Sequence, residues 1–153
     1  MAEGITGEFP GAVLFACNFN RVRSPMAEAL LRLTFGDRIY VDSCGLRPGE
    51  EIDPFVVAVM DELGADLSNY RPKSFDDLDD DSFDLVISLS PEAQHRAVEM
   101  ARGRAIGIEY WPTHDPTQAQ GSREAMLEAY RAVRDGLRVR IVERFGKPST
   151  FGG

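Results

Sequence analysis

Short apolar runs alternate with longer helical stretches along the whole chain, and this alternation constrains the fold more than any other feature of the sequence. The first run, "AVLFA" at 12–16, has the length of a strand and no polar position, as expected for a parallel strand covered on both faces. Three further strand-like segments are 38–45, 83–90 and 105–111. Because alternating strands and helices form crossover units, the pattern predicts an α/β fold with a doubly wound, four-stranded parallel sheet and helices on both faces.

Helix start and stop signals separate the expected strands. Ser24 and Pro25 are typical of an N-cap and a first helical residue, and Gly36 is typical of a helix end. Asp53 and Pro54 repeat the start signal, which accounts fully for that Asp-Pro pair. The first two helices are expected to bury Met26, Leu30 and Leu33, and Val56, Val59, Met60 and Leu63, and two further helices are expected from Pro91 to about 101 and over about 122–145.

Composition and charge narrow the class of protein. The 153 residues contain no repeat or linker, so we expect one domain over 1–153 with flexible tails at 1–10 and 146–153. The net charge of -8 argues against nucleic acid as a partner, and no apolar run approaches a membrane span. Two cysteines and a start without an export signal favour a reducing, cytoplasmic location. With no His/Cys cluster, we expect neither a metal nor a cofactor, and the oligomeric state is left open.

One of the two cysteines lies where the first strand ends and the first helix begins, in "CNFNRVRSP" at 17–25. In a doubly wound sheet ligands bind at this end of the strands, where loop N–H groups and the helix N-terminus attract an oxyanion. We expect Cys17 to be a nucleophilic thiolate, Arg23 to clamp two anion oxygens, and Ser24 to hydrogen-bond the sulfur. The rest of the expected phosphate-binding loop is Asn18, Phe19, Asn20, Arg21 and Val22.

Cys-x5-Arg-Ser-Pro after a first strand, "DSCG" at 42–45, "LGADLSNYRPKSF" at 63–75 and Asp115-Pro116 together resemble one family along most of the chain. They resemble the low-molecular-weight protein tyrosine phosphatases and the arsenate reductases of the same fold. The resemblance implies that Cys17 attacks phosphorus, that Arg23 binds the phosphoryl oxygens and that Asp115 is the general acid. It also implies that Asn20 is held by Ser43.

The chain departs from that family pattern at several positions. Val22 replaces a second cysteine, Phe19 replaces a common glycine, and Thr117 and Gln118 replace tyrosines that stack on the substrate ring. The distal cysteine pair of thioredoxin-coupled arsenate reduction is absent, and Cys44 is expected in the core.

The favoured interpretation is a phosphomonoester hydrolase with a cysteinyl-phosphate intermediate, acting on protein phosphotyrosine or an aryl phosphate. Its first alternative is an arsenate reductase that uses an external small thiol. The second alternative is a non-catalytic module that binds an oxyanion or a phosphoprotein. His114, Tyr70 and Trp111 are weaker candidates: His114 is expected to be exposed, Tyr70 can line a substrate mouth, and Trp111 can do so or lie in the core.

Overall fold

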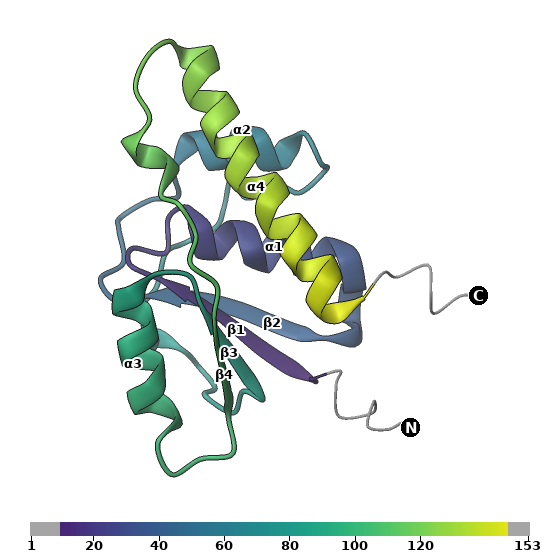
Figure 1. Cartoon of the computed structure of the whole chain (residues 1–153), viewed down its shortest axis with the longest axis vertical. Helices are drawn as coiled ribbons and strands as arrows, with labels where there is room; N and C mark the ends of the chain where they lie inside the picture. The colour runs from purple at the N-terminus through teal and green to yellow at the C-terminus, as the bar shows by residue number, and fades with distance from the viewer. Residues whose placement is uncertain (1–9, 147–153) are drawn as a thin grey trace, which may run out of the picture.

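The computed structural model describes residues 10–146, and its sheet consists of four parallel strands. In the order β2-β1-β3-β4 these are β2 (Tyr40–Gly45), β1 (Ala12–Cys17), β3 (Leu85–Ser88) and β4 (Gly107–Tyr110) (Figure 1). The predicted doubly wound parallel sheet is confirmed, and the last three strands in chain order are shorter than the sequence suggested. The expected flexible tails lie outside the described residues, apart from Pro10 and Gly146.

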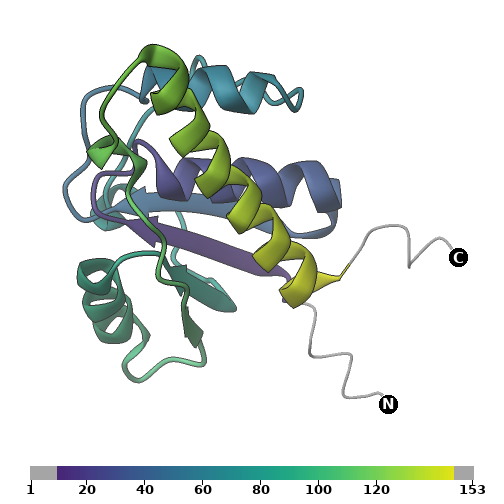
Figure 2. The same ribbon diagram turned by 45° about the horizontal axis from the view of Figure 1, so that its top comes forward.

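Helices cover both faces of this sheet (Figure 2). α1 (Arg23–Phe35), α2 (Pro54–Asp61) and α4 (Arg123–Phe145) pack together on one face, and α3 (Pro91–Ala101) packs on the other. Short 3-10 helices are η2 (Gly36–Arg38), η3 (Phe75–Asp77) and η4 (Pro116–Gln118). Within residues 10–146, no helix is long and apolar enough to cross a membrane.

The two faces of the sheet have separate apolar cores. The larger core lies under α1, α2 and α4, and the side chain of Cys17 belongs to it. The smaller core lies under α3 and contains Cys44. Because successive side chains of a strand point to opposite faces, the strand pairing of Ala16 with Cys44 places the two thiols on opposite sides of the sheet.

Two local predictions about α1 were wrong. The helix begins at Arg23 with Val22 as its N-cap, so Ser24 lies inside the first turn and uses its hydroxyl for contacts with the loop. Leu33 is 49 % exposed, because it lies in a surface groove beside Leu63 and Val142, where the packing of α1 against its neighbours ends.

The start of α2 is as expected. Asp53 caps the helix by accepting a hydrogen bond from the Phe55 N–H at 2.8 Å. Its second carboxylate oxygen accepts a hydrogen bond from the Tyr130 hydroxyl of α4 at 2.7 Å. Asp53 therefore has a structural role at both oxygens and lies outside the cavity of the candidate site.

Candidate active site

The loop after β1 is fastened from outside through its carbonyl groups. Backbone N–H groups of the segment after β2 donate to four loop carbonyls: Leu46 to Cys17 at 3.2 Å, Arg47 to Asn18 at 2.9 Å, Gly49 to Phe19 at 3.0 Å and Asp53 to Arg21 at 3.3 Å. Within residues 10–146, the backbone N–H groups of 18–24 have no acceptor. Since the carbonyls are bound on the outside, these donors are left for an anion, which is the arrangement of an oxyanion nest.

A cavity of about 170 Å³ lies at this loop and brings together the residues expected to do chemistry. Its lining includes Cys17, Arg23 and Asp115, which are separated by up to 98 positions in the sequence. The other lining residues are Phe19, Arg21, Val22 and Thr117. The geometry thus joins a thiol, a guanidinium and a carboxyl around one small space.

Gly45 lets the loop pack against the end of β2. A Cβ atom at this position would lie 2.7 Å from the backbone nitrogen of Asn20 and 2.9 Å from both the carbonyl oxygen of Asn18 and the carbonyl carbon of Phe19. All three atoms are backbone atoms, so no rotamer change would relieve the contact. The glycine of "DSCG" is therefore required by the loop.

Asn20 holds the loop from its centre. Its φ of 53° lies in the left-handed region, which asparagine tolerates better than most residues, and its side chain is fully buried. The Nδ2 group donates to Ser24 Oγ at 2.8 Å and to Ser43 Oγ at 3.1 Å. Oδ1 accepts hydrogen bonds from the Lys73 N–H at 2.8 Å and the Tyr70 hydroxyl at 3.0 Å. The contact between Asn20 and Ser43 implied by the family resemblance is present.

Glu28 extends this network and is absent from the residues predicted from the sequence. Ser43 donates its hydroxyl proton to Glu28 Oε1 at 2.6 Å and also contacts the Tyr70 hydroxyl closely. Arg32 pairs with the other Glu28 oxygen at 2.8 Å. Burial raises the pKa of Glu28, and burial likewise raises that of Tyr70. The only signal in the sequence is that Glu28 lies four residues after Ser24, on the same face of α1.

The thiol of Cys17 is nearly enclosed. Its side chain is 2 % exposed, and Sγ lies 2.9 Å from Ser24 Oγ. Since Asn20 donates to the same Ser24 oxygen, the serine proton is free to point at the sulfur or at the Cys44 carbonyl oxygen, 3.3 Å away. A hydroxyl donated to the sulfur makes the sulfur a better leaving group.

Arg23 connects the loop to the segment that carries the expected acid. Its side chain is 8 % exposed, and Nη1 donates to the carbonyl oxygen of Thr113 at 3.0 Å. The remaining donors of the guanidinium stay available on the side of the cavity that it lines. Arg23 is thus oriented before any anion binds.

Asp115 is followed directly by the short 3-10 helix η4. The carboxyl is the N-cap of η4, where Oδ1 accepts hydrogen bonds from Thr117 N–H at 3.0 Å and Thr117 Oγ1 at 2.7 Å. Among the described residues, the other oxygen has no hydrogen-bond partner. Thr117 therefore orients the carboxyl and leaves its second oxygen facing away from the turn's own hydrogen bonds.

The other predicted loop residues support the loop from its edges. Asn18 Oδ1 accepts a hydrogen bond from Ser90 Oγ at 2.6 Å, and Ser90 also caps α3. Arg21 Nε donates to the carbonyl oxygen of Glu51 at 2.6 Å. Phe19 is 44 % exposed at the rim of the cavity.

The remaining candidates lie elsewhere. Cys44 is fully buried, and burial raises the pKa of its thiol, so it is poorly suited to react. Trp111 is a core residue, and His114 is exposed and lines a different cleft. Within residues 10–146, no group of three or more His, Cys, Asp or Glu side chains could hold a metal ion.

Comparison with known proteins agrees with this geometry. The family model described as low molecular weight phosphotyrosine protein phosphatase matches residues 12–141. The chain is 30 % identical to a glutaredoxin arsenate reductase of Synechocystis sp. over 137 residues. This alignment covers 90 % of this chain and 98 % of the relative. Solved structures that match include an arsenate reductase in a phosphate-binding state, with a TM-score of 0.71, 30 % identity and coverage of 86 % of this chain and 94 % of the other.

A low molecular weight protein tyrosine phosphatase from T. tengcongensis matches as well, with a TM-score of 0.70, 26 % identity and coverage of 85 % of this chain and 94 % of the other. Both kinds of enzyme therefore share the fold of this chain. Since the family model spans most of its length, the chain belongs to the low molecular weight phosphotyrosine protein phosphatase family.

Proposed function

We propose that this protein reduces arsenate with electrons from an external low-molecular-weight thiol. The observation that carries the proposal is 30 % identity along nearly the whole chain to a relative named an arsenate reductase. The cavity at Cys17, about 170 Å³ in volume, suits a tetrahedral oxyanion. These two observations favour arsenate reduction over phosphomonoester hydrolysis, which was the favoured interpretation of the sequence.

Cys17 is the nucleophile in this reaction. Its thiolate attacks arsenic and forms a sulfur–arsenic bond, while one arsenic–oxygen bond breaks and that oxygen leaves as water. The free oxygen of Asp115 is suited to supply the proton that this leaving oxygen needs. The loop N–H groups and Arg23 hold the other oxygens and stabilise their charge.

The thiol that completes the reaction must come from outside. Cys44 lies in the core on the other face of the sheet, so it cannot reach the adduct. An external thiolate attacks the Cys17 sulfur, the sulfur–arsenic bonding pair stays on arsenic, and As(V) leaves as arsenite, As(III). A second external thiol then reduces the mixed disulfide, so two thiols are oxidised to one disulfide for each arsenate reduced.

Hydrolysis of a phosphomonoester is the second candidate, and the position of Asp115 favours it. A carboxyl with one oxygen available beside the nucleophile is what departure of a basic alkoxide or phenoxide requires. The same loop would hold a cysteinyl-phosphate, which water then hydrolyses. The substrate would be an aryl phosphate or a protein phosphotyrosine.

One experiment separates these functions. The purified protein is given arsenate with glutathione or mycothiol, and arsenite is measured; a parallel sample is given phenyl phosphate, and phosphate is measured. We expect arsenite formation to exceed phosphate release, and Cys17→Ser to abolish both while Cys44→Ala keeps most of the activity. Phosphate release alone would make the protein a phosphatase. Neither product, with phosphate still bound, would make it an oxyanion-binding module.

A further inference from the structure

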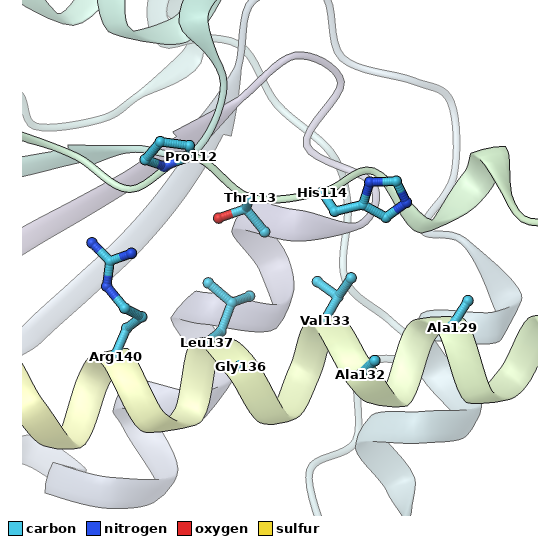
Figure 3. A pocket seen from close by; sticks show the side chains of 9 residues that line it. All are labelled: Pro112, Thr113, His114, Ala129, Ala132, Val133, Gly136, Leu137 and Arg140. Atoms are coloured by element: carbon cyan, nitrogen blue, oxygen red, sulfur yellow. The ribbon is translucent and has the colours of Figure 1, made fainter.

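A second and larger cleft lies between α4 and the segment Pro112–His114 that follows β4 (Figure 3). Its volume is about 430 Å³, which is within the range of small-molecule sites. It shares no lining residue with the cavity that holds Cys17. The two cavities are therefore distinct, although the Pro112–His114 segment leads directly into Asp115.

The floor of the cleft is apolar and open. It is formed by small and branched side chains of α4, among them Ala132, Val133 and Leu137 (Figure 3). At Gly136 an added Cβ atom would meet no atom within 4 Å beyond the backbone of α4 itself, so the space above the helix is open there. Such a surface suits a flat apolar group, which gains free energy by leaving water.

A cation stands at one end of this floor. Arg140 points its guanidinium into the end of the cleft opposite His114 (Figure 3). The guanidinium lies 5.0 Å from the centroid of the buried Trp111 ring, which fixes its position. Among residues 10–146, no carboxylate pairs with Arg140. In a chain with a net charge of -8, this cation is available to the anionic group of a ligand.

The segment Pro112–His114, which lines the cleft opposite α4, also contacts a residue of the oxyanion cavity. The Thr113 carbonyl oxygen accepts the hydrogen bond of Arg23, and Asp115 follows two residues later. A ligand that contacts Thr113 and His114 can therefore shift the guanidinium of Arg23, which lines the oxyanion cavity. Any such effect is reciprocal, since the oxyanion must change the affinity of the ligand by the same factor.

We propose that this cleft is an effector site for a small amphipathic anion, with a flat apolar body on the α4 floor and one carboxylate or sulfonate at Arg140. Occupation of the cleft changes the affinity of the Cys17 loop for oxyanions through the Thr113 carbonyl. The inference uses only oxyanion binding by the loop, so it does not depend on which reaction the protein catalyses.

The binding test uses 2-naphthoate and its neutral analogue 2-naphthamide in isothermal titration calorimetry. We expect the amide to bind about five-fold more weakly or worse, because it lacks the charge that faces Arg140. Arg140→Gln should weaken 2-naphthoate by a similar factor. Arg138→Gln, on the same helix but outside the cleft, is the matched control and should leave the affinity unchanged.

Two substitutions fill the cleft independently. Gly136→Leu and Ala132→Leu place a large side chain in the open space. Each should weaken the binding affinity for 2-naphthoate about ten-fold or more. Thermal unfolding of each variant checks that it is folded, and either variant alone suffices for the test. Binding that persists unchanged in a folded, filled variant overturns the site.

The coupling is measured with inorganic phosphate as the oxyanion. Saturating 2-naphthoate should change the phosphate affinity of the wild-type protein about five-fold or more, and should change nothing in Gly136→Leu. An unchanged phosphate affinity in the wild type overturns the effector role, as does a failure of 2-naphthoate to bind. If the wild-type protein is a dimer in sedimentation and Gly136→Leu is a monomer, the face joins two copies of this chain and the proposal is wrong.

Discussion

Replacement of Gly45 by alanine tests whether the oxyanion loop depends on its close contact with the end of β2. The added Cβ atom would meet three backbone atoms of the loop at 2.7–2.9 Å, and nothing flexible can move away. The φ of Gly45 is not positive, so the substitution introduces a clash without a disallowed backbone angle. Relief requires a shift of the loop or of the strand end, at a cost of about 1–3 kcal/mol in unfolding free energy.

The same shift should harm function more than stability. The loop N–H groups must converge on one anion, and their carbonyl groups are bonded to the segment that begins at Gly45. We expect the phosphate affinity of Gly45→Ala, measured by calorimetry, to fall at least about ten-fold. The melting temperature should fall by roughly 2–12 °C for a chain of this length.

Gly107→Ala is the matched control. This glycine also lies in the sheet, but an added Cβ atom would make only ordinary contacts at 3.5 Å, so phosphate affinity should not change. A Gly45→Ala protein that binds phosphate as tightly as the wild type would refute the dependence of the loop on this contact. Equal losses in both variants would show that the effect comes from the sheet as a whole.

Further variants address the residues at the site and the residues that support it. A lysine at position 23 cannot both donate to the Thr113 carbonyl and present two parallel donors to an anion, so the kcat/KM of Arg23→Lys for arsenate reduction should fall about 100-fold in steady-state kinetics. A near-normal value would show that Arg23 does not bind the anion. Asp115→Asn should slow hydrolysis of phenyl phosphate by about 10²–10⁴-fold but that of 2,4-dinitrophenyl phosphate far less, and equal slowing of both substrates would show that Asp115 only positions the loop. Asp53→Asn should leave both rates unchanged and lower stability by about 1 kcal/mol, because it weakens the hydrogen bond from Tyr130. Burial raises the pKa of Glu28 in the folded protein above its unfolded value, so the folded state holds this proton more tightly and stability is lost as pH rises from about 4.5 through the folded pKa. In Glu28→Gln, the difference in unfolding free energy between pH 5 and pH 8, measured by urea unfolding, should be smaller than in the wild type. An unchanged difference would assign the pH dependence to other groups.

Thr117 determines how the carboxyl of Asp115 is held. Both the N–H and the hydroxyl of Thr117 bond the same oxygen of Asp115, so the carboxyl is oriented by its own turn. Among the residues that line the cavity, the aromatic one is Phe19, at the rim. Threonine at position 117 gives a phosphotyrosine less ring-stacking surface than an aromatic side chain there would give. The arrangement suits a small oxyanion, in line with the proposed reductase.

The fold class followed from the sequence because its signals are local. The apolar run 12–16, the end of α1 at Gly36 and the start of α2 at Asp53 depend on the chemistry of neighbouring residues, and these were confirmed. The Cys-x5-Arg spacing also predicted a loop between a strand and a helix, and β1, this loop and α1 do follow one another along the chain. Even here tertiary contacts overrode a local rule: Ser24 matches an N-cap, but the sulfur of Cys17 and the amide of Asn20 engage its hydroxyl within the helix.

What only the tertiary structure decided is the set of contacts between distant segments. Glu28 gives no chemical signal in an amphipathic helix, yet packing of α1 against β2 places it on Ser43. The hydrogen bond from Arg23 to Thr113 spans 90 positions, and the cleft over Gly136 is bounded by the segment after β4 and by α4, which are far apart in the sequence. A sequence specifies which side chains can form such contacts. Which of them meet is decided by how the helices pack on the two faces of the sheet, because burial and hydrogen bonding are shared among segments that are far apart in the chain.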